Sequence, residues 1–184
     1  MERLWSPWRL AYVTGASGAP DGCIFCNNAE PGREGLVLVR GRLAYVILNL
    51  YPYNNGHLMV VPDRHVATLE ASTADERLEL MTFTRYAEMA LTEAYSPQGI
   101  NIGMNLGRPA GAGVVDHLHV HLVPRWNGDT NFMSVIGNVR VLPEDLGTTA
   151  RRLRPIFERL VQGDLLAFSG QSHCRGAHMT RSQR

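Results

Sequence analysis

Three histidines alternate with apolar residues in the segment 116–124, which reads Asp-His-Leu-His-Val-His-Leu-Val-Pro. Successive side chains of a β-strand point to opposite faces, so the strand that we predict over 114–123 places His117, His119 and His121 on one face. A buried imidazole needs partners for two ring nitrogens, which makes three of them an unusual choice for packing. The row therefore indicates chemistry. Two kinds suit it: a metal site, or an imidazole nucleophile with a second imidazole that handles the proton.

A glycine-rich loop precedes this strand and favours the nucleophilic alternative. Residues 107–113 contain three glycines and one proline. The backbone N–H groups of Gly111 and Gly113 in such a loop can turn toward phosphate oxygens. Attack by a neutral imidazole on phosphorus forms a phosphoramidate and divides one displacement into two. Donors in the loop would stabilise the charge that develops on the phosphate.

A second pattern with chemical meaning is Cys23-Ile24-Phe25-Cys26. The chain has three cysteines, and this odd number argues against a disulfide framework. Cys23 and Cys26 can be half of a zinc site, a redox pair, or a coincidence at the start of a helix. A thioredoxin-like pair opens a helix after a strand, whereas this pair follows a linker of small residues, which disfavours the redox alternative. Zinc requires two further ligands.

Hydrophobic periodicity shows which elements must position these residues. Nearly continuous apolar runs predict four further strands, over 36–39, 43–50, 57–61 and 100–105. Thr73 and Glu76 form a capping-box pattern, and apolar residues at helical spacing follow as far as Tyr95. A second helix is expected over 143–161. This order is not a regular alternation of strand and helix, so it predicts an α+β domain with a mostly antiparallel sheet and two main helices on one face.

Composition limits the classes of function. The chain has 184 residues, 45% of them hydrophobic and 19% charged, which suits one globular domain. We divide it into an N-terminal arm and linker (1–22), the domain (23–162) and a disordered C-terminal tail (163–184). A net charge of +1 argues against nucleic acid or an anionic membrane as a partner. The sequence contains no lysine, which excludes a lysine nucleophile and a phosphate-loop lysine.

The sequence also suggests where the protein works. No run approaches the roughly 18 apolar residues that span a bilayer, and the first residues show no apolar core of a signal peptide. We therefore expect a reducing cytoplasm.

The histidine row, followed by two apolar residues, resembles the signature of the histidine-triad (HIT) superfamily of nucleotidyl hydrolases and transferases. Asn49-Leu50-Tyr51-Pro52 and the run from Gly56 to His65 resemble the upstream half of that motif. The likeness covers about residues 23–135 and implies the HIT-like fold, an antiparallel sheet with two main helices. The runs 3–9 and 124–132 resemble actinobacterial diadenosine tetraphosphate (Ap4A) phosphorylases of this superfamily.

The resemblance implies a role for individual residues. His119 matches the nucleophile that attacks the α-phosphorus, and His121 matches the histidine that contacts phosphate and helps to protonate the leaving group. Asn49 matches a ribose-binding position, His57 a histidine that lines the site, and Asn105 an asparagine near the scissile phosphate.

One departure from the family concerns the phosphate contact. Many members carry Gln or Ser just before the triad strand, where this chain has Gly111-Ala112-Gly113-Val114. Backbone N–H groups must then replace the side chain, and the gap leaves room for a second anion. After the triad, Arg125 can supply charge to a polyphosphate and Trp126 can stack on a base.

The resemblance also implies ligands, partners and a reaction. In zinc-bearing members, Cys-x-x-Cys is completed by two histidines that correspond to His65 and His117, so we expect structural zinc on Cys23, Cys26, His65 and His117, and no organic cofactor. The expected partners are a nucleotide substrate, inorganic phosphate, and copies of the chain in a homodimer or tetramer. The expected reaction converts Ap4A and phosphate into ADP and ATP through a nucleotidyl-histidine intermediate. The alternatives are a HIT hydrolase or phosphoramidase that uses water, a catalytically idle nucleotide-binding protein, and a zinc structural module.

Overall fold

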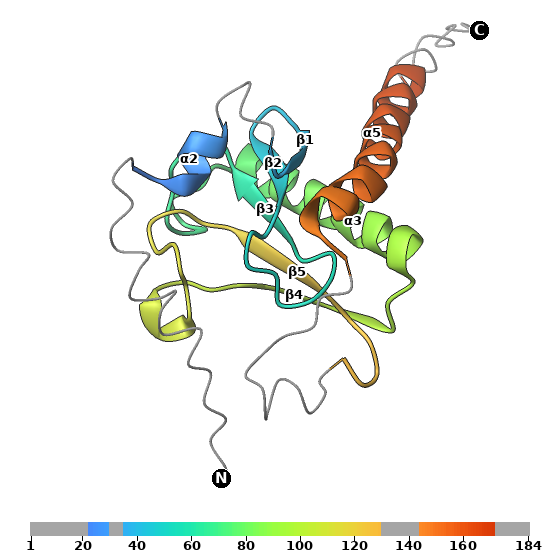
Figure 1. Cartoon of the computed structure of the whole chain (residues 1–184). Helices are drawn as coiled ribbons and strands as arrows, with labels where there is room; N and C mark the ends of the chain where they lie inside the picture. Colours follow the sequence, from blue (N-terminus) through green and yellow to red (C-terminus); the bar gives the residue numbers. More distant parts are fainter. Residues whose placement is uncertain (1–21, 30–34, 130–143, 172–184) are drawn as a thin grey trace, which may run out of the picture.

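The apolar runs and the histidine segment form a five-stranded sheet in the computed structural model, which describes residues 22–29, 35–129 and 144–171, the last eight by backbone alone. Its strands are β1 (Val37–Arg40), β2 (Ala44–Leu48), β3 (Leu58–Pro62), β4 (Gly99–Met104) and β5 (Val120–Arg125). They are ordered β1-β2-β3-β5-β4, and every neighbouring pair is antiparallel. The histidine segment thus ends in β5, between β3 and the edge strand β4 (Figure 1).

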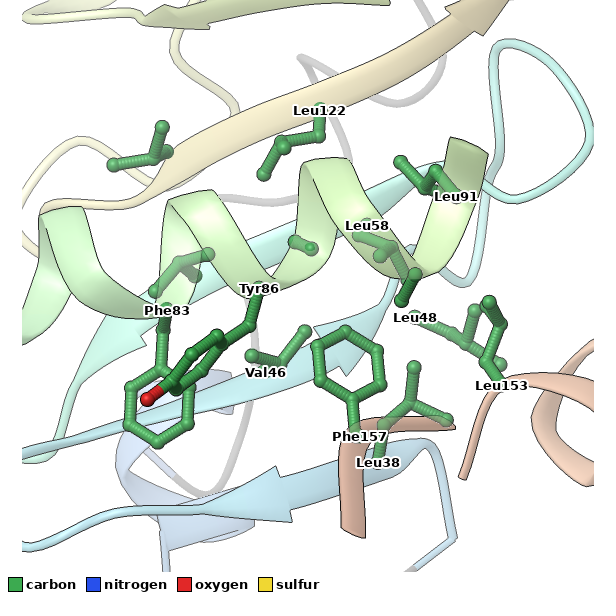
Figure 2. Packing of buried hydrophobic residues seen from close by; sticks show 14 of the residues in the cluster. Leu38, Val46, Leu48, Leu58, Phe83, Tyr86, Leu91, Leu122, Leu153 and Phe157 are labelled. Atoms are coloured by element: carbon green, nitrogen blue, oxygen red, sulfur yellow. The ribbon is translucent and has the colours of Figure 1, made fainter. Parts of the chain in front are cut away.

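Two helices cover one face of this sheet. They are α3 (Ala74–Tyr95) and α5 (Leu146–Gln171), as Figure 1 shows. Their apolar side chains pack on β2, β3 and β5 in one buried cluster, in which Phe83 of α3 and Phe157 of α5 lie against Val46 and Leu48 (Figure 2). The predicted α+β class with two main helices on a mostly antiparallel sheet is confirmed.

The opposite face of the sheet carries a smaller cluster. The short helix α2 (Ile24–Ala29) lies over this face, and its Phe25 is buried with Tyr45, Met59 and Val61. The Tyr45 hydroxyl donates a hydrogen bond of 2.7 Å to the carbonyl of Phe25. This second face holds the histidines, so the sheet separates a helical core from the chemistry.

The predicted capping box of α3 is present. Thr73 accepts a hydrogen bond from the backbone N–H of Glu76, and the Glu76 carboxylate accepts one from the backbone N–H of Thr73. Arg64 adds two bonds to the same carboxylate, at 2.7 and 2.8 Å. These donors lower the pKa of Glu76 to about 2, with the Arg64 bonds as the largest cause.

We expect Glu76 to make stability depend on acid pH. Its ordinary pKa of 4.5 falls to about 2 in the folded chain, so the unfolded state binds more protons between these values and stability falls as pH falls through them. Glu76→Gln should lower the urea midpoint at neutral pH and flatten this part of the profile, since an amide does not titrate. Equal acid losses in wild type and variant would contradict the assignment.

Three boundaries differ from the sequence-based expectations. β5 begins at Val120, not at residue 114, because the pairing with β3 ends at Val60 and Val120. The N–H of Leu118 bonds instead to the carbonyl of Val66, and the carbonyl of Pro62 accepts from the His117 side chain. The second helix, expected over 143–161, runs from Leu146 to Gln171, so the segment 163–171 is helical and not part of a disordered tail. The predicted arm 1–22, except Gly22, and residues 172–184 lie outside the described part.

No helix among the described residues is long and apolar enough to cross a bilayer.

Candidate active site and metal centre

The alternation predicted for the histidine segment holds even before β5 begins. Leu118, Val120 and Leu122 are buried in the core beneath α3, whereas the rings of His119 and His121 meet edge to face on the other side, with centroids 4.7 Å apart. The N–H of Leu118 bonds to the carbonyl of Val66 at 2.6 Å, which keeps the segment extended where no strand partner is available. The sheet therefore presents the imidazoles together, away from the helices.

A hydrogen bond to the backbone fixes the tautomer of His119. Its Nδ1 lies 2.9 Å from the backbone carbonyl of His117, which only an N–H can satisfy. The proton is thus on Nδ1, and Nε2 carries the lone pair. The side chain is only 5% exposed, and this burial lowers the pKa of His119. A neutral imidazole with a fixed lone pair is the form that acts as a nucleophile.

His121 is oriented by a chain of two hydrogen bonds. The backbone N–H of Tyr53 donates to Nδ1 of His57 at 3.1 Å, so the neutral His57 carries its proton on Nε2. Nε2 of His57 lies 3.0 Å from Nδ1 of His121, so Nδ1 of His121 must accept the hydrogen bond. The pattern assigns the remaining proton of His121 to Nε2. His121 is therefore a hydrogen-bond donor beside the nucleophile.

The four residues predicted as metal ligands come together. Cys23, Cys26, His65 and His117 each offer one atom, and these atoms all lie within 4.8 Å of one another. The Sγ–Nδ1 separations are 3.3 Å for Cys23 and His117, 3.2 Å for Cys26 and His65, and 3.6 Å for Cys26 and His117. Tetrahedral zinc, with Zn–S near 2.3 Å and Zn–N of 2.0–2.1 Å, sets a sulfur and a nitrogen about 3.6 Å apart.

The chemistry of this cluster also suits a metal. Nε2 of His117 donates to the carbonyl of Pro62 at 2.8 Å, which turns its Nδ1 toward the sulfurs as metal ligands require. Burial lowers the pKa of His117, so the ring is in the neutral, ligating form. Burial and the neighbouring Cys23 sulfur raise the pKa of the Cys26 thiol, so a thiolate there needs a cation nearby. The donor set and its geometry fit zinc.

Two predicted nucleotide-binding asparagines lie beside these groups. Nδ2 of Asn49 is 3.5 Å from Nε2 of His57, and its Oδ1 accepts from the N–H of Tyr51 at 2.9 Å. Asn105, just after β4, donates to the carbonyl of Gly111 at 3.4 Å. Asn49 is thus in contact with His57, and Asn105 stabilises the glycine-rich loop through a hydrogen bond.

Comparison with known proteins identifies this constellation. The HIT domain family model matches residues 21–128. The chain belongs to the HIT family. It is 46% identical over 167 residues to the AP-4-A phosphorylase of Mycobacterium tuberculosis, covering 86% of each chain. Both the predicted family and the likeness to Ap4A phosphorylases are confirmed.

Solved structures agree with the HIT assignment. A hypothetical histidine triad nucleotide-binding protein from Sulfolobus tokodaii is 28% identical with a TM-score of 0.62, covering 75% of this chain and 93% of the other. A zinc-bound histidine triad family protein from Mycobacterium smegmatis is 25% identical, also with a TM-score of 0.62, and the match covers 79% of this chain and 99% of that one.

Three amides of the glycine-rich loop make hydrogen bonds within the loop itself. Residues 108–110 form a 3-10 turn, and Gly111 follows it in the left-handed region at φ 93°. The N–H of Gly111 donates to the carbonyl of Arg108, and the N–H groups of Ala110 and Ala112 both donate to that of Gly107. The amide of Gly111 therefore closes the turn. The amide of Gly113 takes no part in these three bonds.

Arg125, a predicted phosphate contact, has protein partners at the end of β5. Its guanidinium makes two bonds to the carboxylate of Asp129, at 2.6 and 3.0 Å, and a third to Oδ1 of Asn101 at 2.9 Å. It lies four residues beyond His121 along β5, about 13 Å at the rise of a strand. The half-buried Trp126 follows it, and the backbone N–H of Trp126 donates to the same carboxylate at 3.3 Å. Arg125 and Trp126 therefore both contact Asp129 at the end of β5.

Three residues that contact the histidines or their neighbouring loops were not predicted as site residues from the sequence. Phe25 packs on His117 and His119, and Tyr53 lies over His57 with ring centroids 4.6 Å apart. Asp129 joins the end of β5 to the 51–54 loop, since it also accepts from Asn54 at 2.8 Å. These hydrogen bonds lower the pKa of Asp129, those from Arg125 most. A signal existed only for Phe25, which stands between the two cysteines.

Proposed function

We propose that this HIT protein cleaves dinucleoside polyphosphates, with Ap4A and phosphate giving ADP and ATP through a nucleotidyl-His119 intermediate. The observation that carries the proposal is the single tautomer of His119, whose Nδ1–H is fixed by the carbonyl of His117 and whose Nε2 holds the lone pair. The likeness to an AP-4-A phosphorylase over most of the chain supports the choice of substrate.

The first step transfers a nucleotidyl group to the enzyme. Nε2 of His119 attacks the α-phosphorus, a P–N bond forms, and the bond from that phosphorus to the bridging oxygen breaks. ATP leaves as an anion, which needs little protonation because a polyphosphate is a good leaving group. The Nε2–H of His121 stabilises the charge on the phosphate oxygens as a hydrogen-bond donor. The positive charge on His119 is offset by the carbonyl of His117 at Nδ1.

The second step regenerates the imidazole. An oxygen of inorganic phosphate attacks the same phosphorus, the P–N bond breaks, and ADP leaves with the lone pair returned to Nε2 of His119. Water in place of phosphate would release AMP. Positioning decides between the two acceptors, because water is far more abundant.

The remaining predicted contacts complete this proposal. Asn49 and His57, which lie together beside His121, would bind the ribose and line the site, and Asn105 would hold the scissile phosphate. Gly111 and Gly113, and more remotely Arg125 and Trp126, remain proposed contacts of the polyphosphate and base.

Zinc on Cys23, Cys26, His65 and His117 is proposed as a structural ion. These four residues would hold the ion, and it would supply a structural cross-link between the start of α2 and the histidine segment. No organic cofactor is needed for either step.

We also propose assembly and location. The strand β4 lies at the edge of the sheet, and its Ile102 is exposed, which supports a homodimer or tetramer of this chain. The near-neutral charge supports neither nucleic acid nor a membrane as a partner, and free thiols at Cys23 and Cys26 suit a reducing cytoplasm.

We expect cleavage of Ap4A to depend on added phosphate, because the intermediate needs a positioned acceptor. The test separates products by ion-exchange chromatography with and without phosphate. ADP and ATP that form only with phosphate support the proposal. Equal rates in phosphate-free buffer, with AMP in place of ADP, would make the protein a HIT hydrolase. Absence of cleavage, with nucleotide binding retained, would make it a nucleotide-binding protein.

A further inference from the structure

The helix α2 brings an aromatic ring against the proposed nucleophile. Phe25 is 2% exposed, and its ring centroid lies 4.9 Å from that of His119, with the planes tilted by 47°. The same ring meets His117 edge-on, with centroids 5.4 Å apart. One apolar side chain therefore touches both the residue that reacts and the residue whose carbonyl orients it.

The position of Phe25 is fixed from both of its sides. Cys23 and Cys26 flank it and lie in the metal centre with His117. Between them, the carbonyl of Phe25 accepts a hydrogen bond from the buried hydroxyl of Tyr45 on β2. The ring thus has little freedom to move, and neither does the imidazole that it covers.

The hydrogen bond to the carbonyl of His117 is not enough to fix the orientation of the His119 ring. It anchors one ring nitrogen, but the ring can still tilt about that contact. A second contact on the face of the imidazole removes this freedom and sets the direction of the Nε2 lone pair. Misplacement of a reacting atom by about 1 Å can cost a factor of 10² in rate, so the contact matters more for catalysis than for binding.

We propose that Phe25 is a positioning residue for His119, and that α2, tied to the metal centre by Cys23 and Cys26, is the support that holds it there. Phe25 touches no substrate in this proposal. It acts through the imidazole by holding the Nδ1–H against the carbonyl of His117 and the Nε2 lone pair toward the phosphorus. The metal centre then restrains the nucleophile through α2 and Phe25.

The test compares Phe25→Ala with Ile24→Ala in the zinc-loaded full chain. Ile24 is a matched control, since it lies in the same helix between the same cysteines but is 45% exposed. We expect Phe25→Ala to lower kcat for Ap4A cleavage by about 10- to 100-fold with KM changed less than about threefold. Ile24→Ala should keep both constants, and both variants should keep the zinc content of the wild type.

A second measurement needs no substrate. Long-range ¹H–¹⁵N spectra of the histidine rings report their tautomers, and the wild type should show His119 with its proton on Nδ1 alone. Phe25→Ala should give a mixture of tautomers, whereas Ile24→Ala should not. Phe25→Leu, which keeps an apolar side chain without a ring, provides a folded variant if alanine unfolds α2, and it should fall between wild type and alanine in both measurements.

The outcomes separate this inference from the proposed function, on which only its kinetic part rests. An unchanged tautomer and kcat in a folded, zinc-loaded Phe25→Leu or Phe25→Ala variant would overturn the inference. A rise in KM alone would also overturn it, because it would make Phe25 a binding residue. If the wild type fails to cleave Ap4A, the proposed function fails, while the tautomer spectra still decide the role of Phe25.

Discussion

His119→Ala should abolish turnover of Ap4A while leaving nucleotide binding largely intact. The imidazole supplies the bond-forming atom of the first step, and its Nδ1 is already held by the carbonyl of His117. Loss of a covalent nucleophile removes the intermediate itself and costs several decades in rate. Asn49, His57 and His121 stay in place to bind the nucleotide. The measurement is kcat under saturating substrate, with affinity measured separately by calorimetry.

The control for this variant is Asp116→Ala. Asp116 lies beside the triad in the sequence but is exposed, so its loss should change kcat by less than about twofold, as for most surface substitutions. Mass spectrometry at neutral pH should also find one nucleotidyl group on the wild-type peptide that carries His119. A His119→Ala variant that keeps more than about a tenth of the wild-type kcat would remove this residue from the nucleophile role.

Cys23→Ser should lower the metal content and the thermal stability together. A structural zinc binds the folded chain and not a random one, so its binding free energy adds to folding stability. Mass action gives about 4 kcal/mol when the free metal is a thousandfold above its dissociation constant, and the loss should appear as a large drop in Tm. The Nδ1 of His117 lies 3.3 Å from the Cys23 sulfur and would lose the zinc ion that the two atoms would share.

Cys174→Ser is the matched control, because it removes a thiol that lies outside the described residues and should leave the Tm and the zinc content of the domain unchanged. Zinc is measured by atomic emission on protein purified without chelator. Well under one zinc per chain in the wild type, before any substitution, would decide against a structural zinc.

The features that could be predicted from the sequence are those set by residues close to one another along the chain, or by a family motif. The capping box at Thr73 and Glu76 fixes the start of α3, since both partners lie within one turn. Alternation in the histidine segment predicts which side chains face the core, and it remains correct outside β5. The four metal ligands follow from the family motif, and the structure brings them within 4.8 Å.

Features that depend on distant partners could not be predicted. The third hydrogen bond of the Arg125 guanidinium needs Asn101 on β4, which the pairing of β4 with β5 brings beside it. The start of β5 depends on where its neighbours lie, since the N–H of Leu118 bonds to the carbonyl of Val66 and the His117 ring to that of Pro62. The hydrogen bonds inside the glycine-rich loop, such as that from the N–H of Gly111 to the carbonyl of Arg108, do not follow from the number of glycines, which gives no information about which carbonyls a turn offers to its amides.

Side-chain alternation around His119 makes this segment sensitive to changes in length. A single residue inserted between Leu118 and β5 would turn the residues before it to the opposite face, placing the His117 imidazole toward the core beneath α3 and Leu118 toward the metal centre. The buried ring would then lack partners for its nitrogens, so the fold and the metal centre would fail together. Among related chains, we therefore expect substitutions between the glycine-rich loop and β5 to outnumber insertions and deletions, which belong in the loop itself.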